Sequence, residues 1–510
     1  MTIINEPGVT LQILPSVPAI SGSPQRVLFV GQKTSAGSAT PGVITQVGNQ
    51  GQEDALFGER SMLAAMIRAA RRINSITSFD AIALDDDGGA TAATATVTFT
   101  GPATEDGTLF VTVGSAKNHR YELTINDTDT ATTIAANLAA LITADTRIQV
   151  TAVAALGVVT LTAENAGLEG NFITLRVEGT APAGVTVAIA GFSGGAVNPS
   201  LTTLFDPAAT ERYQTVVYPT TYTLSVLTDF LDPRWNVNNN LLDGVGITSR
   251  VDTYANLITL GTTEESQNIV IFGFKPVADT LWDGSSLIEF PSVISSMFGA
   301  IRAGRFTAGF DLSRYVTVSR GGLDRTGGDA LASLPYFNTP FYDLRLIEPG
   351  KGWTETEYQT LADAGISTIG NDRSRNLVIC GEVRTPYSAT NDYIYLEYVD
   401  TDSKIREIYY NAFKANFRQF RLTEGQLVPN RNIANRASIQ AFVDGVFADL
   451  SGADFVLTQA GEAAREFFRS NRVVTLNVAA GEVQVSMIVP IVGQLRNITG
   501  TLQFVFSTNN

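Results

Sequence analysis

The alternation of hydrophobic and polar positions is most informative between residues 213 and 275, where it predicts a strand, two helices and a second strand. Residues 215–219 and 268–273 are continuously apolar or β-branched runs, which are typical of buried strands. The apolar faces of the two helices are formed by Leu224, Leu227 and Leu231 and by Val251, Tyr254 and Ile258, with Thr248 or Ser249 as the cap of the second helix. Apolar strands joined by helical crossovers are the unit of a parallel sheet covered on both faces.

The region closer to the N-terminus carries the same signals. Residues 26–31 and 79–84 are apolar runs of strand length. Between them, helical spacing over residues 61–73 places methionines and alanines on one face and arginines on the other. We therefore predict an α/β core built from two halves, residues 26–89 and residues 200–390.

The segment between these halves, residues 90–199, is rich in Ala, Thr, Gly and Val. It contains a helical pattern at residues 134–142 and several short β-like runs, at 94–99, 109–113, 121–125, 148–152, 158–162 and 172–177. Short strands at close spacing with Gly, Asn and Asp turns indicate a mostly-β lobe inserted into the core.

The C-terminal part, residues 391–495, predicts an α+β domain. A long aromatic helix is expected at 393–421, with a possible break near Thr401, and a second helix is expected to begin at a Ser438 cap. A third helix at 459–470 precedes two alternating runs, which predict a hairpin; these runs are 472–478 and 482–489.

The pattern predicts a short strand joined by an extended linker at each end of the chain. These are the N-terminal arm, residues 1–25, and the C-terminal arm, residues 496–510. Apolar residues alternate with polar ones in each arm, and they are Val9, Leu11 and Ile13 in the first and Leu502, Phe504 and Phe506 in the second. Prolines at 15, 18 and 24 keep the N-terminal tether extended. The arms could reach another sheet or pair within their own chain, and the pattern alone leaves both possibilities open.

The expected energy of one arm is small. Burying three large apolar side chains contributes roughly 5–9 kcal/mol, and ordering the backbone of one short strand costs about 1–2 kcal/mol for each residue. A single exchanged strand would therefore be marginal, whereas many arms in a lattice would act together. The arms favour a self-assembling structural protein.

Composition narrows the class of protein. The chain has 510 residues, a formal net charge of −15 and one cysteine, Cys380, within an apolar run. The acidic balance argues against a nucleic-acid binder, and the single cysteine rules out an intrachain disulfide and suits a reducing cytoplasm. We expect no secretory signal and no membrane insertion, because no apolar run is long enough.

The residues give no positive case for an enzyme, a cofactor or a metal. His119 is the only histidine, which excludes histidine-dependent triads that need a second histidine in the core as well as histidine-rich zinc sites. Lys33 follows a strand and a glycine, but Arg26 stands where a P-loop requires a glycine. The aspartates at 85–87 lack the ligand spacing of an EF-hand, so a solvated turn is expected.

The order and spacing of several short motifs resemble a known family. These motifs are Pro7-Gly-Val9, 27–32, Phe57-Gly58 and 61–64, then 99–101, 107–109 and 170–171 in the lobe, and finally 364–368 and 490–506. Together they cover nearly the whole chain, and they resemble the contractile tail sheath proteins of bacteriophages, with the Mu-like type as the nearest pattern.

This resemblance implies a fold and a function. Sheath subunits stack as six-fold rings around a tail tube, with a subtilisin-like α/β core (here without a triad), outer insertions and a C-terminal domain near the tube. The resemblance implies that the two arms are the exchanged strands and that the receiving edge is formed by Val483, Val485 and Met487. Contraction would drive the tube through the target envelope without nucleotide hydrolysis. The implied partners are copies of the chain, the tube protein, and baseplate and terminator proteins, in a virion tail assembled in the host bacterial cytoplasm.

Two basic clusters are candidates for contact with the tube. Lys414, Arg418 and Arg421 would form one stripe on the long helix. Arg465 and Arg469, followed by Arg472, form the second. The alternative for each cluster is an ordinary solvated face.

Two other functions remain open from the sequence. The first is another self-assembling virion or baseplate component of a contractile injection machine. The second is a sugar-binding or hydrolytic surface protein that uses the inserted lobe, which would require converging carboxylates.

Overall fold

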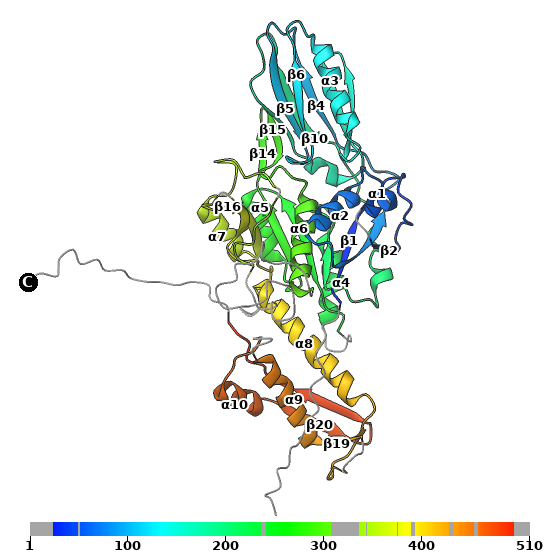
Figure 1. Ribbon diagram of the computed structural model, residues 1–510, viewed down its shortest axis with the longest axis vertical. Helices are drawn as coiled ribbons and strands as arrows, with labels where there is room; N and C mark the ends of the chain where they lie inside the picture. The colour runs from blue at the N-terminus through cyan, green and yellow to red at the C-terminus, as the bar shows by residue number, and fades with distance from the viewer. Residues whose placement is uncertain are drawn as a thin grey trace, which may run out of the picture. The chain divides into compact units, whose positions relative to one another are not determined.

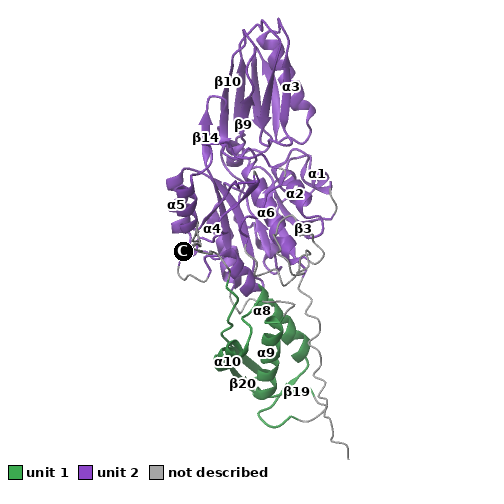
Figure 2. Ribbon diagram, turned by 60° about the vertical axis from the view of Figure 1, so that its left-hand side comes forward, with its two compact units in different colours: residues 1–21, 332–335, 404–510 green, residues 22–331, 336–403 purple. Residues whose placement is uncertain are grey.

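The structure is a computed structural model that describes residues 24–48, 51–235, 241–307, 336–342, 344–374, 376–388, 393–427, 432–452 and 457–493. The chain divides into two compact units (Figure 2). Unit 1 comprises residues 1–21, 332–335 and 404–510, and unit 2 comprises residues 22–331 and 336–403. The predicted exchanged strands, Val9–Ile13 and Leu502–Phe506, lie outside the described residues.

Unit 2 is built on an eight-stranded sheet with the order β17-β16-β13-β12-β11-β1-β3-β2 (Figure 1). Its strands are β1 (Arg26–Gln32), β2 (Ile44–Val47), β3 (Ser78–Leu84), β11 (Thr215–Val217), β12 (Val245–Val251), β13 (Ile269–Phe274), β16 (Ile366–Asn371) and β17 (Leu377–Cys380). The six inner strands are parallel, and the two edge strands are antiparallel to their neighbours. The predicted parallel sheet is confirmed.

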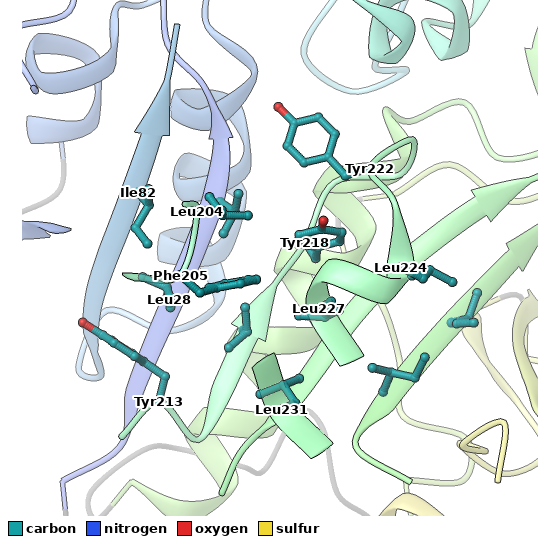
Figure 3. Close-up of a cluster of buried hydrophobic side chains, with 14 of the residues drawn as sticks. Leu28, Ile82, Leu204, Phe205, Tyr213, Tyr218, Tyr222, Leu224, Leu227 and Leu231 are labelled. Carbon is teal, nitrogen blue, oxygen red and sulfur yellow. The ribbon is translucent and has the colours of Figure 1, made fainter. Parts of the chain in front are cut away.

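Helices cover both faces of this sheet, as the continuously buried inner strands require. The helices are α1 (Gln52–Phe57), α2 (Met62–Ile73), α4 (Leu224–Leu231), α5 (Tyr254–Thr263), α6 (Pro291–Phe306) and α7 (Glu355–Asp363). Helix α6 is buried along nearly its whole length and packs against α2 and the central strands. On the other face, Leu227 and Leu231 of α4 pack in one apolar cluster with Leu28 of β1 and Tyr218 (Figure 3).

Strand β12 of the core was not predicted, and neither were β2 and β16. Thr248 and Ser249, which the sequence suggested as a helix cap, lie inside β12, and the cap of α5 is Thr253. Their hydroxyls are buried but satisfied, since Thr248 Oγ1 donates to the carbonyl of Pro219 and Ser249 Oγ is 2.9 Å from Thr220 Oγ1. The prediction was wrong because a sequence pattern does not reveal whether a polar side chain has a buried hydrogen-bond partner, so these residues were assigned to an exposed helix cap.

The inserted lobe is mostly β, as predicted. A four-stranded sheet has the order β10-β4-β8-β7, a five-stranded sheet has the order β14-β15-β9-β5-β6, and one helix packs on the first. The elements are β4 (Thr94–Phe99), β5 (Gly107–Val113), β6 (Arg120–Ile125), α3 (Ala131–Ala144), β7 (Val150–Ala155), β8 (Val158–Ala163), β9 (Leu175–Glu178), β10 (Val187–Ser193), β14 (Pro276–Asp279) and β15 (Trp282–Ser285). Among its described residues, unit 2 also has the 3-10 helices η1 (Leu168–Phe172), η2 (Asp206–Ala208) and η3 (Asp232–Trp235).

Buried polar contacts join the lobe to the core. Asp86 accepts hydrogen bonds from Gln32 Nε2, from Asn165 Nδ2 and from the backbone N–H of Ala166. The sequence predicted a solvated turn here, and the structure shows instead that Asp86 ties the core strand end to the lobe. Asp86 therefore has hydrogen-bond partners both in the core, at Gln32, and in the lobe, at Asn165 and Ala166.

Unit 1 contains the α+β elements of the C-terminal part. They are α8 (Leu396–Phe417), whose first turns belong to unit 2, β18 (Arg421–Leu422), β19 (Ile433–Ala434), α9 (Arg436–Leu450), α10 (Glu462–Ser470), β20 (Val473–Asn477) and β21 (Glu482–Ser486). Helix α8 runs through Thr401 without a break, and the hydroxyl of Thr401 donates to the carbonyl of Glu397 within the helix. The cap of α9 is Asn435, and Ser438 is the third helical residue of its capping box, so the predicted Ser438 cap was wrong.

Candidate assembly surfaces

The predicted hairpin is present in unit 1 and forms a two-stranded sheet. Strands β20 and β21 are antiparallel, with Val474 opposite Val485 and Leu476 opposite Val483. Among the described residues neither strand pairs with a third, so both outer edges keep unpaired backbone donors and acceptors. An unpaired edge of this kind is a template for adding another strand.

The two valines of β21 lie on the packed face of this hairpin. Val474 is buried on the side where β20 packs against α9. Because cross-strand partners point to the same face of a sheet, Val483 and Val485 share this side. Val483 is nevertheless 37% exposed. The apolar face of the hairpin therefore extends beyond what α9 covers.

The third predicted receiving residue lies outside the strand. Strand β21 ends at Ser486, so Met487 belongs to the segment that leaves the hairpin. This segment is held further along, where the backbone N–H of Gln459 donates to the carbonyl of Pro490 over 2.8 Å. Val483 and Val485 therefore lie together on β21, whereas Met487 lies just beyond the end of this strand.

The first basic cluster is not a single helical stripe. Helix α8 ends at Phe417, so Lys414 lies on its last turn, Arg418 follows its end and Arg421 lies in β18. All three side chains are exposed. The rings of Phe417 and Phe420 meet edge to face just after the end of the helix, where the chain turns toward β18.

The second basic cluster is partly neutralised. Arg465 and Arg469 are exposed on α10. Arg469 forms long ion pairs with Asp444 and Glu462, and Arg472 forms two hydrogen bonds of 2.5 and 2.8 Å with the same Asp444. Arg469 and Arg472 are thus paired with acidic side chains. Within the described residues, no acidic partner is seen for Arg465.

The histidine and the cysteine that were considered as catalytic groups have structural surroundings instead. His119 is buried, and its Nδ1 is 2.8 Å from Asp145 Oδ2. Burial raises the pKa of Asp145, but hydrogen bonds from His119 and from the backbone of Arg147 outweigh it and hold this pKa below its usual value. Burial raises the pKa of Cys380 to about 11, which makes its thiol a poor nucleophile.

Lys33 is likewise an internal residue. Its ammonium group lies 3.3 Å from the carbonyl of Gly37 and 3.3 Å from Asp85 Oδ1, and its side chain is 8% exposed. Among the residues that the structure describes, no group of three His, Cys, Asp or Glu side chains is placed to hold a metal ion. No described helix is long and apolar enough to cross a membrane.

Comparisons with known proteins bear directly on the predicted resemblance. No protein-family model matches the chain. The Mu-like prophage FluMu tail sheath protein of Haemophilus influenzae is 26% identical over 458 residues, covering 85% of this chain and 85% of that protein.

Two solved structures are also similar. The sheath tail protein of Desulfitobacterium hafniense has a TM-score of 0.46 at 12% identity, covering 96% of this chain and 100% of that one. The contracted sheath complex of an extracellular contractile injection system, PVC, has a TM-score of 0.48 at 11% identity, covering 100% of this chain and 99% of that one. Likenesses at this level carry no further conclusion.

The match to the Haemophilus influenzae protein therefore confirms both the expected resemblance, to contractile tail sheath proteins of the Mu-like type, and the function that goes with it, that of a structural subunit of such a sheath.

Proposed function

We propose that this chain polymerises around a tail tube and that contraction of the assembly drives the tube through the target cell envelope, with no nucleotide hydrolysis. The observation that carries the proposal is the match to a tail sheath protein along 85% of both chains. The internal contacts of Lys33 support the last part, because a lysine already surrounded by carbonyls is not placed to hold phosphates.

The core is proposed to have a subtilisin-like architecture without catalytic activity. Its support is the mostly parallel sheet with helices on both faces. The proposed division of the chain remains 1–25, 26–89, 90–199, 200–390, 391–495 and 496–510. The β14–β15 hairpin complicates it, since this hairpin lies in the second half of the core but pairs with β9 of the lobe.

Strand exchange is the proposed link between subunits. The arms at Val9–Ile13 and Leu502–Phe506 would pair with the hairpin of a neighbouring copy at Val483, Val485 and Met487. The support is the open edge of β21 and its partly exposed valine. An added strand would satisfy the backbone groups of this edge and would cover the apolar face that α9 leaves open.

The remaining partners follow from the proposed assembly. Copies of the chain would stack as six-fold rings, in contact with the tail tube protein and with baseplate and terminator proteins. Lys414, Arg418, Arg421, Arg465 and Arg469 are the proposed tube contacts, on the basis of their exposure. The place of the protein would be the virion tail, assembled in the host bacterial cytoplasm, with no nucleic acid, membrane insertion or cofactor.

Negative-stain microscopy of the purified chain, beside a version that lacks residues 1–14, tests this function. Long striated tubes from the intact chain, lost on truncation, would support both the sheath and the N-terminal exchanged strand. Tubes from both versions would keep the sheath and reject that arm as its essential link. Monomers under all conditions, even with tube and baseplate proteins added as templates, would contradict polymerisation and favour a baseplate component.

A further inference from the structure

A cleft of about 670 Å³ lies in unit 2 between the core and the inserted lobe. The core wall is formed by α2 and the start of α1, and the lobe wall by the turn between β5 and β6 and by the chain that follows α3. Small-molecule sites in proteins commonly have volumes of roughly 300–1,000 Å³. The cleft has the size of a ligand site, and the proposed sheath function makes no use of it.

Positive side chains come from both walls although the chain as a whole is acidic. Arg68 and Arg72 lie on α2, and Lys117 and Arg147 lie on the lobe side. Arg68 and Arg147 share the two oxygens of Asp54. Asp54 therefore offsets part of the charge of this pair and holds the two guanidinium groups in place across the cleft.

Arg72 and Lys117 lie on facing walls and are both exposed. The Arg72 guanidinium makes a long contact with the lobe side, 3.4 Å from Nη1 to Asn118 Oδ1. Two cations on opposite walls of one polar cleft are suited to bind the separate oxygens of one phosphate or carboxylate, because charge-assisted hydrogen bonds to such oxygens are the stronger kind.

The remaining lining is polar and built to hold its shape. His119 is fixed by its hydrogen bond to Asp145. At the base of the cleft, Ser115 Oγ donates to Glu289 Oε2 over 2.9 Å, and both side chains are buried. Carboxylates, an imidazole and amides at fixed positions can accept hydrogen bonds from hydroxyl groups and donate to hydroxyl oxygens.

We propose that this cleft is a binding site for an acidic monosaccharide, meaning a sugar of one ring that carries a phosphate or a carboxylate. The anion lies between Arg72 and Lys117, and the hydroxyl groups face the polar lining around His119 and Asp145. The proposal does not depend on polymerisation, since every residue named belongs to one unit of one chain.

Isothermal titration calorimetry of the full chain at low salt tests the site with four probes, namely glucose 6-phosphate, glucuronate, glucose and inorganic phosphate. We expect saturable binding of glucose 6-phosphate or glucuronate in the range of about 0.1–1 mM, and at least about tenfold weaker binding of glucose and of inorganic phosphate. The ratio between the first two probes distinguishes a phosphate from a carboxylate ligand.

Two variants and a matched control locate the site. Arg72→Gln and Lys117→Gln should each weaken the binding by about tenfold. Arg373→Gln removes an equally exposed charge from the turn between β16 and β17, and it should change the affinity less than twofold. No saturable binding of either acidic sugar to the folded chain would overturn the proposal. So would binding that survives both variants, or inorganic phosphate that binds as tightly as the sugars.

Discussion

Arg302 on α6 and Asp400 on α8 form a buried ion pair, with 2.5 Å between Nη2 and Oδ1 and with side-chain exposures of 4% and 0%. Tyr336 donates its hydroxyl to the second oxygen of Asp400 over 2.6 Å. Arg302 Nη1 donates to the carbonyl of Gln214 and to Thr215 Oγ1. The pair thus ties the first turns of α8, within unit 2, to the central helix and to the strand β11.

Breaking this pair on one side should be costly. We expect Asp400→Asn to lower the free energy of unfolding of unit 2 by about 3–5 kcal/mol, because Arg302 would keep its buried charge without its partner. The double variant Arg302→Met with Asp400→Leu should lose much less. Urea titrations followed by circular dichroism measure both. Lys351→Gln, which removes an exposed pair with Asp279, serves as the control. Equal losses from the single and double variants would contradict the argument.

Glu289 should make stability depend on pH. Burial raises the pKa of Glu289 to about 7, whereas an unfolded glutamate has a pKa of about 4.3. Its contribution is therefore fully present below about pH 4.3 and is lost as the pH rises through 7. Relative to Glu289→Gln, the wild-type chain should lose about 2–4 kcal/mol between pH 4 and pH 8.5.

The measurement is the difference in unfolding free energy between the two proteins across that pH range. Glu59→Gln, at an exposed position in the same unit, is the control substitution. A flat difference for Glu289→Gln would mean that folding leaves the pKa of this carboxyl unchanged, which would contradict the argument.

Two helical glycines should respond oppositely to alanine. A Cβ at Gly261 in α5 would lie 2.0 Å from the carbonyl oxygen of Ala364, whereas a Cβ at Gly445 in α9 would meet nothing within 4 Å. Gly261→Ala should lower stability by about 2–3 kcal/mol despite its better helix propensity. Gly445→Ala should raise it by about 0.5–1 kcal/mol. Thermal unfolding compares them, and a stabilising Gly261→Ala would disprove the close approach of α5 to this carbonyl.

The two basic clusters can be tested separately as contacts with the tube. Replacing Lys414, Arg418 and Arg421 together by alanine, or Arg465 and Arg469 together, should loosen the attachment of the proposed sheath to its tube without blocking ring assembly. Co-sedimentation with the tube protein over a salt series measures this, since an electrostatic contact weakens as salt rises. A cluster whose removal leaves binding unchanged at every salt concentration is not a tube contact.

Much of the core and of the inserted lobe could be predicted from local pattern. Helix α2 and strand β4 have nearly the predicted bounds, at Met62–Ile73 and Thr94–Phe99. Each carries its signal within its own sequence, as a cap and a helical spacing in the first and as strict alternation in the second. The order and spacing of short motifs also led to the family resemblance, because a linear order of motifs is a property of the sequence itself.

Other features depend on residues that only the folded chain brings together. Strand β12 was missed because the hydroxyls of Thr248 and Ser249 find their partners about 29 positions away. The alternating pattern predicted the hairpin that contains β21. Packing against α9 decided which valine of this strand stays exposed.

The cleft between core and lobe joins Arg72 on α2 to Lys117 and Glu289, far along the chain. Local periodicity reports which face of an element avoids water. It carries no record of which distant residue covers that face. The sequence by itself therefore determined the elements and their family pattern, and the tertiary structure decided the partners of the buried polar groups and the shape of the surfaces.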